Sequence, residues 1–346
     1  MISIESLNPE WIKVKRAEFK ADPIIIEKVI RALILLESLK SSNLNFIFKG
    51  GTALMLMIQE PRRFSIDIDI IIEDKEQNID KVLDEVVVNT GFTKWEEHKR
   101  KSKSDIEKQH FKLHYTPISS QEGSTNNILL DIVYEPNPYL QIQEIDVSHF
   151  LLKEEKSPLK VVVPTLEAIL GDKLTAYGPN TTGVPLSKPK EVMKQIYDVA
   201  GIFDRITSIQ NVRDNFINVA KSELAYKGFN ADNFQIIIDD IINCSFYYCS
   251  YGKYDANTFK LMQEGVSGLN NFIYGDKFRQ PQAQIAVAKA SYLAKIIEKE
   301  QTDIIRFDVK ADMSKWTITS REHTFLNKLK KHNLEAFHYW CHVFLE

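Results

Sequence analysis

The chain has 346 residues, enough for two domains or for one domain with a large helical extension. Its content of 44% hydrophobic and 26% charged residues is ordinary for a soluble globular protein. With a net charge of −3, the chain as a whole lacks the basic character that would indicate nucleic-acid binding. Local basic stretches nevertheless occur at 94–103 and 328–331.

Cysteine usage and hydropathy indicate a cytoplasmic protein without a membrane anchor. The three cysteines are too few, and odd in number, for a disulfide framework. The N-terminus has no basic start followed by an apolar core, so we expect no signal peptide. No run approaches the roughly 18 uncharged apolar residues that spanning a membrane requires.

The first 72 residues combine helical and strand patterns. Asp22 followed by Pro23 is a helix start signal, because Asp caps the helix and proline fits its first turn. In chain order we expect a helix over 22–40, a strand over 44–48, a helix from Gly51 to about residue 58, a loop over 60–63 and a strand over 64–72.

Beyond residue 72 the pattern changes from mixed to helical. We expect a helix over 77–89, strands over 92–95, 106–115, 127–134 and 160–163, and helices over 166–177 and 190–203. From about residue 208 onward the pattern is mainly helical. The chain therefore predicts an α/β domain over 1–205, with an N-terminal helical segment, and an α-helical domain over 206–346.

Two short motifs carry most of the chemical information. The Gly50-Gly51-Thr52 turn comes between a strand and a helix, where exposed backbone N–H groups suit a phosphate. Asp67 and Asp69, spaced i and i+2 on a predicted strand, share one face. Two adjacent carboxylates are unfavourable without a cation between them, and they suit Mg²⁺. Together the motifs predict a site for a metal ion and a nucleotide.

A third carboxylate, Asp131, lies in the otherwise apolar strand predicted over 127–134. A charged residue in such a run is costly to bury without a partner, so we expect a nearby cation. If this strand lies beside that of Asp67 and Asp69, Asp131 completes the carboxylate set and draws an acceptor hydroxyl group toward a metal ion.

Three basic side chains are candidates for binding the phosphates. Arg62 or Arg63, just before the aspartate strand, is placed to reach a triphosphate. Lys173, on the helix predicted over 166–177, is a candidate for stabilising a leaving pyrophosphate. For each of these side chains, exposure to solvent is the simpler alternative.

Four segments in this order resemble the AbiEii/AbiGii nucleotidyltransferase toxin family, within the polymerase-β-like nucleotidyltransferase superfamily. Lys49–Leu54 is similar to the glycine motif of that family, and Arg63–Asp69 is similar to its metal motif. Pro164–Leu174 is similar to its lysine-bearing third motif, and Lys190–Asp198 to its fourth, which supplies a final aspartate. The resemblance covers roughly residues 24–205.

The resemblance implies a mixed sheet flanked by helices and a cytoplasmic, MenT-like toxin neutralised by an antitoxin. It implies transfer of NMP from an NTP to a macromolecular acceptor, the 3′ end of tRNA above all, with Mg²⁺ as cofactor and Mn²⁺ as its alternative. The nucleotide-binding residues expected are Gly50, Gly51, Thr52, Arg63, Ser65 and Lys173. The catalytic residues expected are Asp67, Asp69, Asp131, Lys173 and Asp198, with the first three as metal ligands.

Two other functions fit the same motifs. A transferase that modifies a small molecule such as an antibiotic, or a protein, shares the glycine and aspartate motifs. A nucleotide-binding module without turnover is the alternative outside enzymes, but a retired site would be free to lose its clustered carboxylates. His338, Cys341 and His342 have the spacing of metal ligands on a helix, but their aromatic neighbours favour ordinary packing.

Overall fold

The computed structural model describes residues 1–58, 62–99, 107–118 and 123–344. The chain forms two compact units: unit 1 is Met1–Thr165 with Asn271–Asp276, and unit 2 is Leu166–Asn270 with Lys277–Glu346. Part of the predicted loop at 60–63, the first residue of the strand predicted over 106–115 and the basic residues at 100–103 lie outside the described residues.

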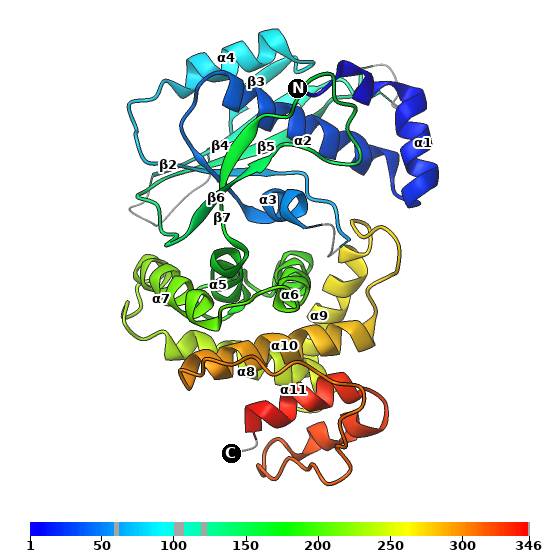
Figure 1. The fold of residues 1–346 in the computed structure, drawn as a ribbon, viewed down its shortest axis with the longest axis vertical. Helices are drawn as coiled ribbons and strands as arrows, with labels where there is room; N and C mark the ends of the chain where they lie inside the picture. The colour runs from blue at the N-terminus through cyan, green and yellow to red at the C-terminus, as the bar shows by residue number, and fades with distance from the viewer. Residues whose placement is uncertain (59–61, 100–106, 119–122, 345–346) are drawn as a thin grey trace. The chain divides into compact units, whose positions relative to one another are not determined.

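Unit 1 contains most of the elements predicted for the first part of the chain (Figure 1). Its helices are η1 (Ile4–Leu7), α1 (Pro9–Phe19), α2 (Pro23–Ser41), α3 (Gly50–Met57) and α4 (Ile79–Asn89). Its strands are β1 (Ile47–Lys49), β2 (Ile68–Ile72), β3 (Lys94–Glu97), β4 (Glu107–Tyr115), β5 (Asn126–Tyr134), β6 (Ile142–Asp146) and β7 (Lys160–Pro164). The Asp22 side chain accepts a hydrogen bond from the Ile24 N–H, which confirms the predicted start of α2.

The sheet of unit 1 is mixed and confirms the predicted α/β class. Its strand order is β1-β2-β5-β4-β3; the β2–β5 pair is parallel and the other neighbours are antiparallel. β6 and β7 form a separate two-stranded sheet. The sequence analysis missed β6 because most of its residues are exposed and it lacks the apolar alternation of a half-buried strand.

The two faces of the sheet differ in composition. Residues 128, 130, 132 and 134 of β5 are buried in the main core, together with residues 68, 70 and 72 of β2. α2 and α4 pack together on this sheet (Figure 1). The alternate residues point to the opposite face, where Ile71 is buried and Asp69 and Asp131 are half-buried.

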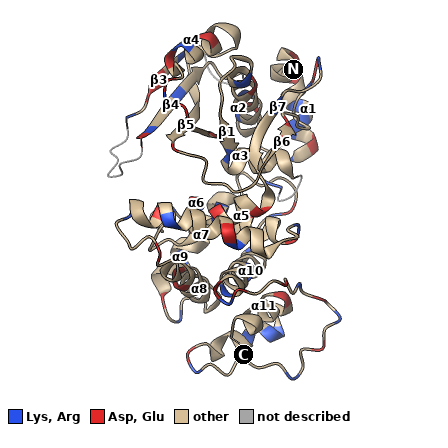
Figure 2. Cartoon of the chain, turned by 60° about the vertical axis from the view of Figure 1, so that its left-hand side comes forward, with Lys and Arg blue, Asp and Glu red and all other residues tan. Residues whose placement is uncertain are grey.

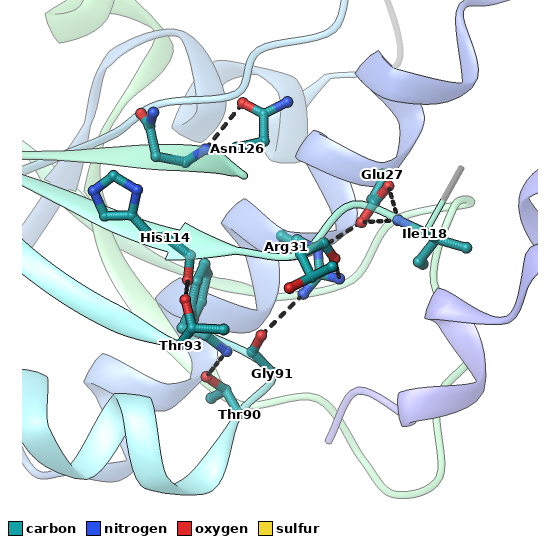
Figure 3. Close-up of polar contacts among 11 residues, drawn as sticks. Glu27, Arg31, Thr90, Gly91, Thr93, His114, Ile118 and Asn126 are labelled. Atoms are coloured by element: carbon teal, nitrogen blue, oxygen red, sulfur yellow. Dashed lines mark hydrogen bonds and ion pairs between the residues drawn. The ribbon is translucent and has the colours of Figure 1, made fainter. Parts of the chain in front are cut away.

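A buried ion pair within α2 also bonds to the chain that follows β4 (Figure 3). The Arg31 Nε donates to Glu27 Oε1 at 2.8 Å, and the side chains are 7% and 2% exposed. The guanidinium group also donates to the carbonyl oxygens of Gly91 and Thr116, while the Ile118 N–H donates to Glu27. These bonds satisfy charges that would be costly to bury alone.

The regular secondary structure of unit 2 is helical. They are α5 (Leu166–Tyr177), α6 (Pro189–Phe203), α7 (Ile209–Tyr226), α8 (Gln235–Cys249), α9 (Ala256–Leu269), α10 (Gln280–Glu298), η2 (Thr324–Lys331) and α11 (Leu334–Phe344). By packing, the chain passes from unit 1 to unit 2 after residue 165 rather than near residue 205, because α5 and α6 pack with the helices that follow them. The division by catalytic motifs at residue 205 stays a prediction.

Charges of both signs are interspersed along the ribbon, as the small net charge leads one to expect (Figure 2). In the described part of the chain, no helix combines the length and the apolar character needed to cross a bilayer.

Candidate active site

The glycine turn forms the start of α3 at the end of β1. Gly50 has φ +81°, a conformation that favours glycine. A Cβ atom at Gly50 would lie 2.3 Å from Asp69 Oδ2, so only glycine lets the turn approach this carboxylate so closely. The glycine turn therefore packs directly against Asp69, the second aspartate of the metal motif.

Arg63 and Ser65 approach the same helix start from the other motif. A Cβ atom at Gly51 would lie 2.7 Å from Arg63 Nη2 and 2.8 Å from Ser65 Oγ. Arg63 is only 5% exposed, and its Nη1 donates to the Phe64 carbonyl oxygen at 3.2 Å. A guanidinium group, a hydroxyl group and the N-terminus of a helix thus converge, which is an arrangement suited to phosphate oxygens.

Thr52 connects the glycine turn to Asp67. Its buried hydroxyl group donates to the Asp67 carbonyl oxygen at 2.6 Å. Asp67 itself lies one residue before β2, which begins at Ile68 rather than at the predicted residue 64. The Thr52 hydroxyl therefore holds the backbone that carries the first aspartate.

A row of polar residues crosses the half-buried face of the sheet. Asp69 is the register partner of Lys49 on β1 and of Asp131 on β5. Asp131 is in turn the register partner of His110 on β4, and His110 Nδ1 lies 2.7 Å from Asp131 Oδ1. Register partners present their side chains on one face of the sheet. The Asp69 and Asp131 side chains therefore lie next to each other on the paired strands β2 and β5.

The return segment, Asn271–Asp276, adds a piece of chain to unit 1 next to Arg63. Ile273 forms an antiparallel bridge with Arg63, in which the Phe64 N–H donates to the Phe272 carbonyl oxygen at 2.8 Å. The Tyr274 N–H donates to the Arg62 carbonyl oxygen at 3.0 Å. The Tyr274 ring stacks on the Phe64 ring with 4.5 Å between centroids. These contacts fix the backbone on both sides of Arg63.

Lys173 and Asp198 form a second group of candidate residues, in unit 2. Lys173 Nζ lies 2.7 Å from Asp198 Oδ2 and donates to Gln195 Oε1 at 3.2 Å. The two charged side chains are 7% and 1% exposed, respectively. This buried pair joins α5 to α6, so both side chains have a structural role in addition to any role in catalysis.

The carboxylates of the sheet suit Mg²⁺ or Mn²⁺ by their chemistry. In the described residues, no three His, Cys, Asp or Glu side chains are arranged to hold a metal ion by themselves. Mg²⁺ commonly binds one or two carboxylates and completes its shell with water and substrate phosphates. Asp69 and Asp131 on paired strands, with Asp67 one residue before β2, offer carboxylates that suit that kind of site.

Several residues at this site were not identified by the sequence analysis. His110 is the partner of Asp131 where we expected an unspecified cation, and its place in an alternating strand was the only available signal. Lys49 was noted only as part of a motif, yet it is the register partner of Asp69. The return segment carried no signal at all, because its pairing with Arg63 joins residues that are distant in the chain.

Comparison with the structure of MenT4 supports the fold. MenT4, a nucleotidyltransferase toxin from Mycobacterium tuberculosis, aligns with a TM-score of 0.54 and 11% identity over 95% of this chain and 97% of that one. JHP933 from Helicobacter pylori aligns with a TM-score of 0.45 and 15% identity over 87% and 94% of the two chains. A search of curated proteins finds no significant match.

The match to a protein family is more direct. The family described as "Nucleotidyl transferase AbiEii toxin, Type IV TA system" matches residues 33–245, more than half of the chain. The matched range contains the glycine turn, the aspartates and the Lys173–Asp198 pair. The chain therefore belongs to the AbiEii family of nucleotidyltransferase toxins, and it is a nucleotidyltransferase.

Proposed function

We propose that this toxin transfers an NMP group from an NTP to a macromolecular acceptor, with the 3′ end of tRNA as the leading candidate and with Mg²⁺ as cofactor. The observation that carries the proposal is the contact between the two motifs. The glycine turn, Arg63 and Asp69 lie together at the start of α3. Phosphate-binding groups thereby adjoin carboxylates suited to a metal ion.

In the proposed reaction the acceptor hydroxyl oxygen forms a bond to the α-phosphorus atom of the NTP, and the bond from that atom to the bridging oxygen of pyrophosphate breaks. Mg²⁺, when bound, supplies charge neutralisation at the phosphates. Arg63 and the α3 N-terminus would hold the triphosphate, and Asp67, Asp69 and Asp131 would hold the metal ion. Asp131 accepts the hydroxyl proton, while His110 orients its carboxylate group.

Lys173 and Asp198 enter the proposal through the motifs that they occupy. We assign Lys173 to the leaving pyrophosphate and Asp198 to positioning Lys173 through their 2.7 Å ion pair. As a member of a type IV toxin–antitoxin family, the protein is expected to have a cognate antitoxin. The experiment below identifies the acceptor and the base of the NTP.

The decisive experiment is label transfer from each α-³²P-NTP, with Mg²⁺, into total cellular RNA and protein. We expect the wild type to label the tRNA band, and Asp67→Asn and Asp69→Asn to reduce labelling at least about a hundredfold. Asp80→Asn, a change of an exposed aspartate on α4, serves as the matched control and should label normally. Label in protein instead of RNA would redirect the proposal to protein modification. Unchanged labelling in both aspartate variants would refute the site.

A further inference from the structure

Unit 2 presents aromatic side chains to solvent where the turn after α8 contacts η2. Tyr251 and Tyr254 in this turn are 41% and 45% exposed, respectively. The Tyr254 ring lies edge-on to the ring of Phe325 in η2, with 6.3 Å between centroids. The Tyr251 hydroxyl group lies 2.8 Å from Nε2 of His332, the residue after η2. These contacts join two segments that are distant in the chain into one surface.

Two lysine side chains lie over these rings. Lys253 Nζ is 5.0 Å from the centre of the Tyr254 ring and 5.0 Å from that of the Phe325 ring. Lys328 Nζ is 4.1 Å from the centre of the Phe325 ring. Both lysines are exposed, and the face of an aromatic ring attracts an ammonium group. Positive charge and aromatic rings therefore alternate on this surface, which we call the aromatic patch: Tyr251, Lys253, Tyr254, Phe325 and Lys328.

The surroundings of the aromatic patch are basic although the whole chain is not. Residues 251–255 and 321–332 contain five Lys or Arg and two Asp or Glu, whereas the chain has a net charge of −3. One of the two acids, Asp255, caps α9: its carboxylate group accepts bonds from the Thr258 N–H at 2.9 Å and from the Thr258 hydroxyl group at 2.7 Å. The excess of positive charge attracts a polyanion, whose counterions are released when lysines neutralise its phosphates.

The exposed rings are held in place by Phe246 of α8. Phe246 is 5% exposed, and its ring centre lies 4.9 Å from that of Tyr254 and 4.8 Å from that of His323. Because the Tyr254 ring is already packed, less conformational entropy is lost when a planar group stacks on it. Tyr251 has φ +56°, which is uncommon for a bulky residue and persists only where the surroundings hold it. The aromatic patch therefore has a fixed shape before any partner binds.

We propose that the aromatic patch binds unpaired nucleotides of an RNA, with bases stacked on Tyr251 and Tyr254 and phosphates beside Lys253 and Lys328. Rings for stacking among cations for the backbone are typical of surfaces that bind single strands without reading their sequence. An acidic polypeptide would use the charge but leave the exposed rings without planar partners, so RNA is favoured. The choice of RNA rests on the proposed function, in which the acceptor is RNA.

The family match does not account for this surface, because the aromatic patch lies entirely beyond residue 245, where the match to the AbiEii family ends. The two segments also carry no joint signal in the sequence. Only the tertiary contacts between the turn and η2 bring the tyrosines of one to the basic residues of the other.

Binding of labelled RNA to the full chain, without NTP or Mg²⁺, tests the stacking. The probe is a fluorescent oligouridylate of about 12 nucleotides, followed by anisotropy. We expect Tyr254→Leu to weaken binding about tenfold and Tyr254→Phe to preserve it, because stacking needs the ring and not the hydroxyl group. Phe229→Leu, at an aromatic residue of 41% exposure before the start of α8, is the matched control and should bind as the wild type does. Equal affinity of Tyr254→Leu and the wild type would overturn the proposal.

The salt dependence of the same binding tests the lysines, whose exposed side chains can be changed without disturbing the core. Each phosphate of a single strand that is neutralised contributes about 0.7 to the slope of log K against log salt. Lys253→Gln/Lys328→Gln should therefore reduce that slope by about 1.4, whereas Tyr254→Leu should leave the slope unchanged. Lys227→Gln, at an exposed lysine before the start of α8, is the control. An unchanged slope in the double lysine variant would contradict the proposal.

A competitor and the label-transfer assay separate the remaining outcomes. Competition by polyglutamate as strong as that by unlabelled RNA would show that charge alone governs binding, and would overturn the assignment to RNA. Wild-type labelling of RNA with equal RNA affinity in all variants would refute the aromatic patch and leave the proposed function standing. RNA binding that depends on the aromatic patch, without any labelling of RNA, would support the patch and contradict the proposed reaction.

Discussion

Gly51 lies where the ends of the Arg63 and Ser65 side chains approach α3, at 2.7 and 2.8 Å from the position of an added Cβ atom. Gly51→Ala should displace these flexible ends without disturbing the backbone. We therefore expect about tenfold weaker NTP binding with little change in Tm, measured by titration and thermal unfolding. Gly268→Ala, whose Cβ atom would make only ordinary contacts, is the control. Unchanged NTP affinity in Gly51→Ala would exclude Arg63 and Ser65 from the phosphate site.

Glu27 is the buried counter-ion of Arg31. Glu27→Ala leaves the guanidinium group buried without its partner, which should lower the free energy of unfolding by about 3–5 kcal/mol in urea titrations. Glu10→Ala removes a comparable but exposed partner of Lys13 and should cost less than about 1 kcal/mol. Similar costs for both variants would mean that the buried pair is not a determinant of the stability of unit 1.

At the scale of elements, α5 lies close against the backbone of α7 at Gly171. A Cβ atom there would lie 2.7 Å from the Phe216 backbone nitrogen and 2.9 Å from the Val212 carbonyl oxygen. Backbone atoms cannot move aside as side chains do, so Gly171→Ala should lower the free energy of unfolding by roughly 1–3 kcal/mol. Thermal unfolding beside Gly268→Ala checks this expectation. Equal stability of the two variants would show that the helices can separate at little cost.

The return segment is expected to act on the active site through Tyr274. Its ring stacks on Phe64, and its backbone pairs with Arg62, so removing the ring loosens the chain on both sides of Arg63. We expect Tyr274→Ala to raise KM for the NTP severalfold more than it lowers kcat, whereas Tyr274→Phe should keep KM near the wild-type value. A fall in kcat with KM unchanged would mean that the segment does not position Arg63.

At the scale of the whole molecule, each unit contains a histidine with a lowered pKa, the half-buried His149 in unit 1 and the buried His338 in unit 2. Burial, with Lys15 nearby, lowers the pKa of His149 to about 4, and burial, with the neighbouring His342, lowers that of His338 to about 4. In the unfolded chain the pKa of histidine is about 6.5. Between these values the unfolded chain binds protons that the native state does not, so stability is complete above about pH 6.5 and falls toward pH 4.

Urea unfolding between pH 7.5 and pH 4.5 measures this acid sensitivity. We expect the double variant His149→Phe/His338→Phe to lose less stability over this range than the wild type. His332→Gln, at an exposed histidine, should follow the wild type. Parallel curves for the wild type and the double variant would assign the acid sensitivity to other groups.

Local patterns predicted much of the fold and the composition of the candidate site. The starts of α2, α5 and α6 lie within a residue or two of their predicted positions, because capping residues and helical periodicity are local signals. β1 is shorter than predicted and β2 begins later, since apolar runs do not show where pairing starts. The roles of Asp67, Asp69 and Lys173 stay predictions that the label-transfer experiment tests.

The sequence by itself determined the family of this protein and predicted its candidate site, from a glycine turn, paired aspartates and a lysine motif within the range that matches the AbiEii family. Only the tertiary structure decided that β5 pairs parallel to β2, that His110 meets Asp131 and that the return segment pairs with Arg63. The physical reason is that capping and periodicity depend on residues a few positions apart. Pairing between distant strands depends instead on how the whole chain buries its apolar faces.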